Sequence, residues 1–448
     1  AASTSRSMTP PMPSSSHHRR CRPRSPAITL YPTALLASTA VLLFTSAAAS
    51  ALPRSHHIDP TLLAHANSSG TGDIPALPPI PQNTLPSLNR TCSNNQLGTI
   101  FAALHTMRTF ECGCKGDRFV KAYARLYPKI TANDVFIDVG LNKGYHTLEF
   151  YANWNTALLA KHGTTTLANH SKNLRAAGVP PQSACREHLS NEPFEARDPG
   201  KLGESNPPLR CYGFDVNPNV ANVENALRAS LPPGTPFTAV NKGVYNSSTS
   251  ITITAPGGRD MPGSFHIDPA NPTTTANTVE IPLHTIDRHL ELLNLTDSPI
   301  AFLKIDIEGL DPLALDGAST LLASKNLKFL TFEYHILGHW HTRNLTFFIN
   351  TLHEHGFVCY MPHLNAHEPG GALVRLTGCV RKNWDGPGGI LTSFRVKNWS
   401  EVMCVSPERL PKLAELFDRV AVAAGEGWFG DGRLCLDKDG RETSHCEN

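Results

Sequence analysis

Residues 135–144, with the sequence VFIDVGLNKG, constrain the fold of this chain more than any other segment. Three apolar residues that favour β structure lead to Asp138, and a turn with Gly140 and Gly144 follows before a stretch of helical character. This order predicts a buried parallel strand that enters a tight turn and then a helix. Because glycine has no Cβ, the backbone N–H groups of such a turn can approach a nucleotide-like ligand closely. Asn142 stands where the dinucleotide-binding fingerprint has its middle glycine, and asparagine tolerates the left-handed conformation that the turn requires.

Strand-like and helix-like segments alternate along the chain after this run. Apolar runs predict strands at 211–216, 237–241, 279–282, 300–306 and 329–333. Helical periodicity predicts helices at 145–159, 220–230 and 312–323, and a helical region at 97–127 that is interrupted near 112–114. Because parallel strands are joined by right-handed crossovers, the expected fold class is α/β, with a Rossmann-like, doubly wound and mostly parallel sheet. A candidate hairpin is expected at 250–255, and an antiparallel edge pair at 357–361 and 373–378.

The N-terminal region has the composition of a targeting signal. The first 58 residues contain six Arg and no acidic residue, whereas the rest of the chain carries 34 basic and 38 acidic residues. Residues 1–26 are expected to form a cytosolic or targeting region, and the apolar residues 27–51 fit either a cleaved signal peptide or a signal anchor. Either one directs the rest of the chain to the lumen of the secretory pathway or out of the cell. An organelle transit peptide, as for plastids, is the alternative, because the region is rich in Ser and Arg.

Composition divides the remainder into three parts. Residues 52–95 are rich in Pro, Ser, Asn and Thr and predict a stalk or linker. The α/β domain is expected at 96–410, with a polar, Pro-interrupted surface insertion at about 161–208. Residues 411–448 form an extension that contains cysteines. The excess of acids beyond the N-terminal region excludes the basic footprint of a nucleic-acid-binding protein.

Ten of the 11 cysteines lie beyond the targeting segment, and an even number in a secreted chain predicts disulfide bonds. A zinc site is not expected, because only Cys112 and Cys114 resemble a pair of zinc ligands. Seven N-x-S/T sequons predict N-glycosylation and favour the same secretory route. They begin at Asn67, Asn89, Asn169, Asn246, Asn294, Asn344 and Asn398.

Polar residues at the ends of the expected strands locate the candidate site. Ligands of doubly wound sheets bind outside the carboxyl ends of the strands. Asp138, Asp215 and Asn241 follow three of the apolar runs. The carboxylate of Asp215 suits the two hydroxyls of a ribose, because it can accept a hydrogen bond from each. Its alternative role is to cap the helix that follows.

The sequence FLKIDIEG at 302–309 carries the strongest catalytic signal. Lys304, Asp306 and Glu308 alternate with apolar residues, so they share one face if the strand continues. Charged groups at the end of a central strand are costly to bury unless they are paired, and they usually mark a site. We therefore expect these three residues to belong to the catalytic site.

These elements together resemble the FkbM-type family of S-adenosylmethionine-dependent methyltransferases. The resemblance covers about residues 130–405 and rests on D-V-G-x-N-x-G at 138–144, F-D-V-N-P at 214–218, T-I-D at 285–287, K-I-D-I-E-G at 304–309 and D-G-A at 316–318. The chain departs from the family pattern in spacing, because Asp215 follows Gly144 by 71 residues where a nucleotide-binding unit has about 20. In addition, Asp215 and Asp311 stand where Glu is common in the family.

The resemblance implies a seven-stranded methyltransferase sheet, S-adenosylmethionine as the cofactor and, in most members, methylation of a hydroxyl oxygen. The acceptor would be a glycan or a small molecule. The resemblance assigns the loop beneath the methionine portion of the cofactor to Asp138, Gly140 and Gly144, and the ribose to Asp215. We add Asn142, which lies in the Gly loop, and Asn241, which ends the strand expected at 237–241, to the cofactor site.

A hydroxyl acceptor loses its proton as the new bond forms, so a base within hydrogen-bond reach assists the reaction. Asp306 is the first candidate for this base, Glu308 the second and His335 the third. Lys304 is expected to pair with one of the acids or to orient the acceptor. This assignment makes Lys304, Asp306 and Glu308 the predicted catalytic residues.

A divalent metal is a further option that we do not expect. Asp306 and Glu333 end adjacent strands if the strand order holds, but no third ligand is evident. The cluster of His335, His339 and His341 is expected in a surface or capping role on a loop or irregular helix. Two other functions stay open at this point: a type II membrane glycosyltransferase, suggested by the anchor, stalk and sequons, and a non-catalytic glycan-binding module on a methyltransferase fold. The oligomeric state is not predicted.

Overall fold

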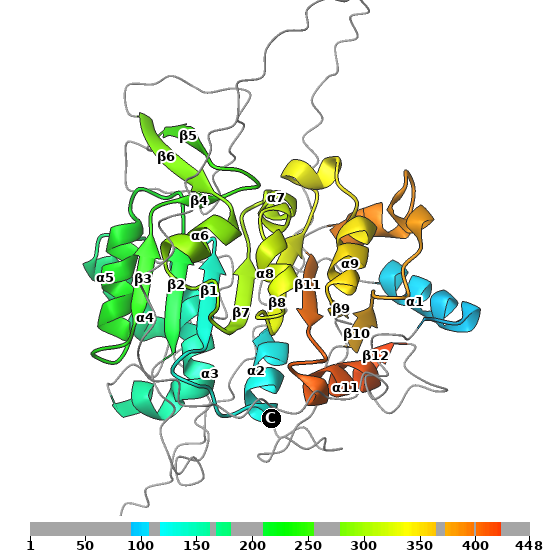
Figure 1. The fold of residues 1–448 in the computed structure, drawn as a ribbon, viewed down its shortest axis with the longest axis horizontal. Coiled ribbons are helices and arrows are strands. Elements are labelled where there is room, and N and C mark those ends of the chain that lie inside the picture. The colour runs from blue at the N-terminus through cyan, green and yellow to red at the C-terminus, as the bar shows by residue number, and fades with distance from the viewer. Residues whose placement is uncertain are drawn as a thin grey trace, which may run out of the picture. The chain divides into compact units, whose positions relative to one another are not determined.

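Within the residues that the computed structural model describes, nine strands form one sheet in the order β12-β10-β9-β11-β8-β7-β1-β2-β3 (Figure 1). The described residues are 91–106, 117–161, 167–180, 209–254, 278–363, 372–397 and 400–422. All of them lie in the unit that spans residues 80–448. The expected N-region at 1–26, the signal segment at 27–51 and most of the expected linker at 52–95 lie outside them.

Five of these strands run parallel to one another and form one half of the sheet. Every residue of β1 is buried, as expected of a parallel strand that is covered on both faces. The α/β class and the mostly parallel sheet predicted from the sequence are therefore confirmed. In spatial order the five strands are β3 (Phe237–Val240), β2 (Arg210–Phe214), β1 (Val135–Val139), β7 (Ile300–Ile305) and β8 (Phe329–Tyr334).

The other half of the sheet is mostly antiparallel. β11 lies between β8 and β9 and is antiparallel to both, and β10 and β9 form the predicted antiparallel pair. β11 was not expected from the sequence, and neither was β12, which pairs with β10 at the edge. The described sheet thus has nine strands where seven were expected. The strands of this half are β9 (Val358–His363), β10 (Ala372–Arg375), β11 (Ser400–Val405) and β12 (Ala421–Val422).

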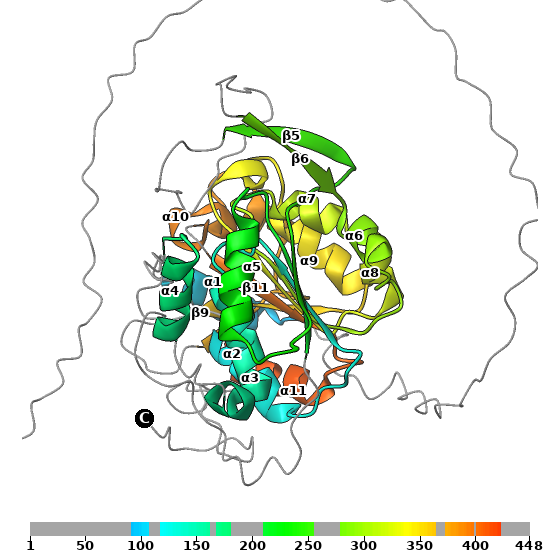
Figure 2. The ribbon, with the colours of Figure 1, turned by 90° about the vertical axis from the view of Figure 1, so that its left-hand side faces the viewer.

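Helices cover both faces of the sheet, because the side chains of each strand alternate between the faces. Val135, Ile137 and Val139 of β1 belong to one core cluster, whereas Phe136 belongs to the other. Figure 2 shows α6, α8 and α9 on one side of the sheet and α4 and α5 on the other.

Two helical layers result. The first contains α1 (Asn94–Thr106), α6 (Ile286–Leu292), α7 (Asp311–Asp316), α8 (Ser319–Ser324) and α9 (Leu345–Glu354), with the short turns η4 (Gly338–His341), η5 (Lys382–Asp385), η6 (Ile390–Thr392) and α10 (Phe394–Lys397). The second contains α2 (Asp117–Leu126), α3 (Tyr145–Lys161), α4 (Leu167–Ala176), α5 (Val220–Ser230) and α11 (Pro411–Val420).

A second sheet of three described strands lies beyond the carboxyl ends of the parallel strands, at the top of Figure 1. β5 pairs antiparallel with β6, so the segment expected as a hairpin at 250–255 has its partner further along the chain. The strand expected at 279–282 belongs to this sheet and not to the main one. In spatial order the strands are β4 (Gly243–Val244), β6 (Thr278–His284) and β5 (Thr249–Thr254).

The stretch at 161–208, expected as a surface insertion, contains the packed helix α4. Leu167, His170, Ser171 and Leu174 repeat at helical spacing and are buried, so one face of α4 belongs to the interior. The rest of this stretch beyond residue 180 lies outside the described residues. The surface interpretation is therefore wrong for α4.

Two further boundaries differ from the expectation. The helix expected at 312–323 is divided into α7 and α8 around Gly317, where an added Cβ would lie 2.4 Å from the carbonyl oxygen of Tyr245. The domain also continues past residue 410, because the apolar face of α11, including Leu413 and Phe417, is buried in the second core cluster.

Among the described residues, disulfide bonds join Cys92 to Cys379 and Cys359 to Cys404. The first ties the start of α1 to the turn after β10, and the second ties β9 to β11. Cys211 in β2 is a buried free thiol. The predicted disulfide chemistry is thus present, whereas Cys112 and Cys114 lie outside the described residues. No helix of the described part of the chain is both long and apolar enough to cross a membrane.

Candidate active site

Lys304 lies between two carboxylates at the end of β7. Its Nζ is 3.2 Å from Asp138 Oδ1 and 3.2 Å from Asp306 Oδ2, and it donates to the Gly140 carbonyl oxygen at 3.4 Å. The pairing of β1 with β7 sets this contact, because Asp138 stands directly opposite Lys304 in the register. Burial alone would lower the pKa of Lys304, but the charges of Asp138 and Asp306 raise it above its usual value. Lys304 is therefore a buried ammonium ion.

Asp138 is completely buried beneath the loop that follows β1. Its Oδ1 accepts a hydrogen bond from Lys304, and its Oδ2 accepts one from Thr147 Oγ1 at 2.7 Å. Burial raises the pKa of Asp138, and Lys304 and Thr147 oppose that shift. Since both oxygens are bonded inside the protein, Asp138 fastens β1 to β7 and to the first turn of α3.

The loop after β1 needs glycine where the sequence has it. Gly140 has a φ of 85°, and an added Cβ would lie 1.8 Å from the Asp306 carbonyl oxygen. Gly144 has a φ of 74°, and its added Cβ would lie 2.4 Å from a methyl group of Leu227 in α5. Asn142 is also left-handed, with a φ of 50°, as predicted. The loop therefore packs against β7 on one side and α5 on the other.

Asp215 joins this loop to the one that follows β2. Its Oδ2 accepts the backbone N–H of Asn142 at 2.6 Å, and its Oδ1 accepts that of Asn217 at 2.8 Å. Asn241 donates its side-chain N–H to the carbonyl oxygens of Asp215 and Asn217, at 3.0 and 2.8 Å. The structure thus brings Asn142, Asp215 and Asn241 together. Asp215 does not cap α5, whose N-cap residue is Asn219.

The chain turns sharply after β7, so Lys304, Asp306 and Glu308 do not share one strand face as expected. β7 ends at Ile305, and Glu308 and Gly309 have φ angles of 54° and 95°. The backbone of Leu337 packs closely against this turn, because a Cβ on Gly309 would lie 2.6 Å from the Leu337 carbonyl oxygen. A non-glycine residue in this conformation is strained, and such strain is typical of functional sites.

The half-buried side chain of Glu308 has a pKa near neutrality. Burial raises the pKa of Glu308 to about 7, and the charge of Asp306 adds to the shift while Lys304 opposes it. At physiological pH this carboxyl group can therefore both accept and release a proton.

Asp306 and Glu333 share a hydrogen bond between their side chains, which are 28% and 20% exposed. Burial alone would raise the pKa of Asp306, but Lys304 and His146 lower it below its usual value. Burial and the charges of its acidic neighbours raise the pKa of Glu333 well above its usual value. The two shifts have opposite directions, so the shared hydrogen bond favours the ionised form of Asp306 and the protonated form of Glu333. Asp306 directly follows β7 and Glu333 lies in β8, and these two strands are adjacent as the metal hypothesis required.

Asp311 lies beneath this pair and is fully buried. Its carboxyl oxygens accept the backbone N–H groups of Gly309 at 3.1 Å and Glu333 at 3.3 Å. Burial, with a contribution from the charge of Asp306, raises the pKa of Asp311 to about 8. Within the described residues, no group of three or more His, Cys, Asp or Glu side chains is arranged to hold a metal ion.

The histidine cluster divides in a way that the sequence did not predict. His335 is completely buried, because it directly follows the buried strand β8; its Nδ1 accepts the Leu337 N–H at 3.1 Å. Its Nε2 lies 3.7 Å from a carboxyl oxygen of Glu333. The surface role expected for His335 is therefore wrong. His339 and His341 lie on the short turn η4.

Three residues of the site were not identified from the sequence. His146 and Thr147 belong to the first turn of α3, and Asp311 to the first turn of α7. A position-based signal exists for the first two, because a helix that follows a Gly loop directs its first turn at the strand ends. Asp311 had been noted only as a departure from the family pattern.

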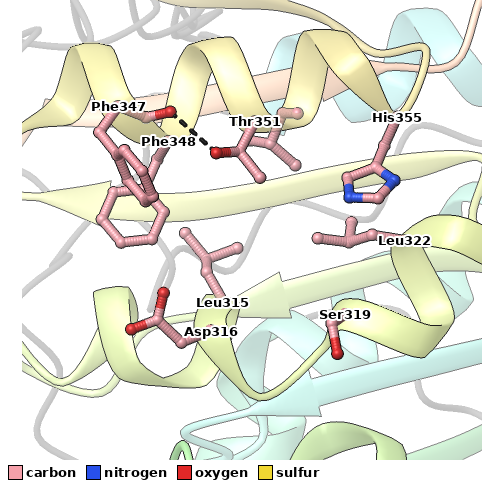
Figure 3. A pocket seen from close by; sticks show the side chains of 9 residues that line it. Leu315, Asp316, Ser319, Leu322, Phe347, Phe348, Thr351 and His355 are labelled. Carbon is pink, nitrogen blue, oxygen red and sulfur yellow. Dashed lines mark hydrogen bonds between the residues drawn. The ribbon is translucent and has the colours of Figure 1, made fainter.

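A separate cavity of about 190 Å³ lies among α7, α8 and α9 (Figure 3). Leu315 and Phe348 form its apolar wall, and Asp316, Ser319 and His355 lie around it. It contains none of the residues predicted for the site. The candidate site at the carboxyl ends of β1, β2, β7 and β8 is thus separate from this cavity.

Comparison with known families identifies this arrangement. The model of the methyltransferase FkbM domain matches residues 63–359, which is more than half of the 448-residue chain. The chain belongs to the FkbM methyltransferase family, as the sequence motifs implied. A search of the curated proteins found no match, and a search of the solved structures found none either. Membership of this family supports a methyltransferase.

Proposed function

We propose that this chain is an S-adenosylmethionine-dependent O-methyltransferase that acts on a hydroxyl group of a glycan or small molecule. The observation that carries the proposal is the position of Lys304, which links Asp138 under the loop after β1 to Asp306 beside Glu308. One buried cation thus connects the loop assigned to the cofactor with the acids assigned to the reaction. We further take seven neighbouring strands of the main sheet as the methyltransferase sheet, in the spatial order β3-β2-β1-β7-β8-β11-β9. The edge strands β10 and β12 are then additions to it.

The residues present fit the proposed cofactor. Asp215 is half-buried and each of its oxygens accepts one backbone N–H, so lone pairs remain for the hydroxyls of a ribose. Lys304 is the ion-pair partner of both Asp138 and Asp306, so two carboxylates share one ammonium ion, and the remaining negative charge suits a ligand that carries a positive sulfonium. When bound, S-adenosylmethionine supplies an electrophilic methyl group.

We assign the role of general base to Glu308 rather than to Asp306, the first choice from the sequence. Asp306 is ion-paired with Lys304, and its lowered pKa makes it a weaker base. Glu308 has a pKa of about 7, and no described residue forms a hydrogen bond with its side chain. Its carboxylate takes the hydroxyl proton while the acceptor oxygen bonds to the methyl carbon and the carbon–sulfur bond breaks. Asp306 and Lys304 are positioning residues for this step.

The proposed setting is the lumen of the secretory pathway, or the outside of the cell, with the plastid as the alternative. Association with a membrane would occur through residues 27–51 if they are retained. A nucleic-acid partner is not proposed, and neither is a resident metal. The glycosyltransferase and glycan-binding alternatives have no support from the family comparison.

Calorimetry of S-adenosylmethionine binding to the full chain tests the proposal. Asp215→Ala is expected to weaken binding, because it removes the acceptor for the ribose and releases Asn142 from its contact. The surface variant Glu291→Gln is the control and keeps the affinity of the parent chain. Equal affinity in Asp215→Ala and Glu291→Gln contradicts the assigned cofactor site.

The reaction itself is tested by mass spectrometry of a glycan library incubated with the chain and S-adenosylmethionine. A gain of one methyl group per acceptor is expected. Turnover of a nucleotide sugar without a response to S-adenosylmethionine identifies a glycosyltransferase instead. Binding of a glycan without any turnover identifies a binding module.

A further inference from the structure

We propose that Asn294 carries an N-linked glycan. This inference concerns a modification of the protein and is independent of the methyl-transfer reaction. Asn294 opens the sequon Asn294-Leu295-Thr296, in the turn between α6 and β7.

The backbone holds Asn294 in a defined cap at the end of α6. Its φ is 54°, and its N–H donates to the Glu291 carbonyl oxygen at 3.0 Å. The Leu295 N–H donates to the Leu290 carbonyl oxygen at 2.8 Å. These two bonds form a Schellman motif, in which the left-handed position is taken by Gly or Asn. Asn294 therefore has a backbone that is fixed at the end of the helix.

The side chain of Asn294 is exposed and makes no hydrogen bond with any described residue. Thr296 is exposed as well, and Leu295 between them is buried and anchors the turn. The amide group thus has room for a bulky, hydrated substituent, and no contact of the fold is lost when one is attached.

A glycan at this position would not obstruct the candidate active site. Asn294 lies before the first residue of β7, whereas the candidate site lies at the carboxyl end of that strand. A six-residue strand separates them by roughly 20 Å. The two can therefore coexist on one molecule.

The disulfide bonds support passage of the chain through the secretory pathway, where N-glycans are attached. Cys92–Cys379 and Cys359–Cys404 join residues of this domain, and such bonds form in oxidising compartments. The secretory lumen is the oxidising compartment in which an asparagine amide meets a lipid-pyrophosphate oligosaccharide. In that transfer Asn294 Nδ2 bonds to the anomeric carbon, the lipid pyrophosphate leaves with the bonding electrons, and one amide proton is released.

The other described sequons are less well placed. Asn169 lies inside α4 and is half-buried. The side-chain oxygen of Asn246 accepts a hydrogen bond from Ser247 at 3.4 Å. In the sequon that begins at Asn344, Thr346 is buried in the first turn of α9. Asn294 is the position where exposure, a free amide and a fixed backbone coincide.

A matched pair of variants tests the proposal in the full chain, expressed in eukaryotic cells with its own N-terminal region. Thr296→Ala destroys the sequon and Thr296→Ser keeps it, and both leave Asn294 in its left-handed cap. The hydrogen bond that the Asn326 side-chain amide donates to the Thr296 carbonyl oxygen is also kept in both. Neither variant touches the site.

Peptide N-glycosidase treatment in heavy-oxygen water followed by mass spectrometry reads the modification, because it converts a glycosylated asparagine to a labelled aspartate. The parent chain and Thr296→Ser are expected to give the labelled aspartate at position 294, and Thr296→Ala is expected to migrate as a species with one glycan fewer. Recovery of unmodified Asn294 from the parent chain overturns the proposal. Equal migration of Thr296→Ala and Thr296→Ser before glycosidase treatment also overturns it.

Discussion

Lys304 and Asp138 face each other across the paired strands β7 and β1, with 3.2 Å between ammonium nitrogen and carboxylate oxygen. The side chains are only 10% and 1% exposed, so each charge depends on the other. Removing one partner of a buried pair leaves an uncompensated charge, which costs about 3–5 kcal/mol. The pair is therefore a structural support for the loop that follows β1.

Lys304→Met is expected to lower the free energy of unfolding by about 3–5 kcal/mol, because it leaves the buried carboxylate of Asp138 without its ion-pair partner. Denaturant titration followed by circular dichroism measures this change. Lys325→Met breaks the exposed ion pair with Glu408 and is expected to cost about 0–1 kcal/mol. Equal costs in the two variants contradict a buried charge at Lys304.

Glu308→Gln is expected to reduce kcat by about 10²–10⁴-fold, because the amide cannot take the acceptor proton. Binding of S-adenosylmethionine should persist, since the change lies outside the loops of Asp215 and Asn142. In the parent enzyme the base is active when deprotonated, so kcat/KM should rise with pH up to about 7 and then level off. A pH-rate profile checks this, and a rate that is flat from pH 5 to about 8 argues against Glu308.

Gly140→Ala is expected to be much more damaging than Gly178→Ala, although both glycines have a positive φ. A Cβ on Gly178 meets nothing within 4 Å, so its cost is limited to the left-handed conformation, about 1–2 kcal/mol. A Cβ on Gly140 would collide with the backbone of Asp306 and push the loop away from β7. Thermal unfolding compares the two variants, and similar melting temperatures would contradict the close approach of loop and strand.

Asp311→Asn is expected to flatten the pH dependence of stability. The folded chain binds a proton at Asp311 below about pH 8, whereas the usual value for an Asp carboxyl is 3.8. Between these values the folded state holds the extra proton, so the free energy of unfolding falls as pH rises, by up to about 1.4 kcal/mol per pH unit. Above about pH 8 this contribution has been lost.

Urea titrations of the parent chain and of Asp311→Asn at several pH values between 5 and 8 measure that slope. The substitution removes one titrating group. The slope of the free energy of unfolding against pH should therefore be shallower in Asp311→Asn, by up to about 1.4 kcal/mol per pH unit, which corresponds to one proton. Asp297→Asn, an exposed change near β7, is the matched control and should keep the slope of the parent. Identical slopes in all three proteins contradict a protonated Asp311.

Local sequence patterns predicted much of this fold and the positions of several candidate-site residues. The run at 135–144 is continuous and apolar up to its glycines, so strand, turn and helix could all be identified from it. Asp306 and Glu333 were placed on adjacent strands by the order of the crossovers, and β7 and β8 confirm that adjacency. Asp215 was placed beside the Gly loop, and the structure brings its carboxylate to Asn142.

The parts that were not predicted depend on contacts between distant segments. β11 enters the sheet between β8 and β9, out of chain order, and no local pattern encodes that insertion. The turn at Glu308 depends on Gly309 meeting the backbone of Leu337, which is remote in sequence. The burial of His335 likewise follows from its place after β8, and histidine composition alone suggests a surface.

The Cys92–Cys379 bond, which spans 287 positions, turns most of the domain into a covalent ring. Every strand from β1 to β10 lies inside that ring, and Cys359–Cys404 fastens β11 to it from outside. A protease that cuts the backbone once between residues 92 and 379 therefore releases no fragment. The two pieces of the nicked protein stay covalently joined until a reductant opens the ring.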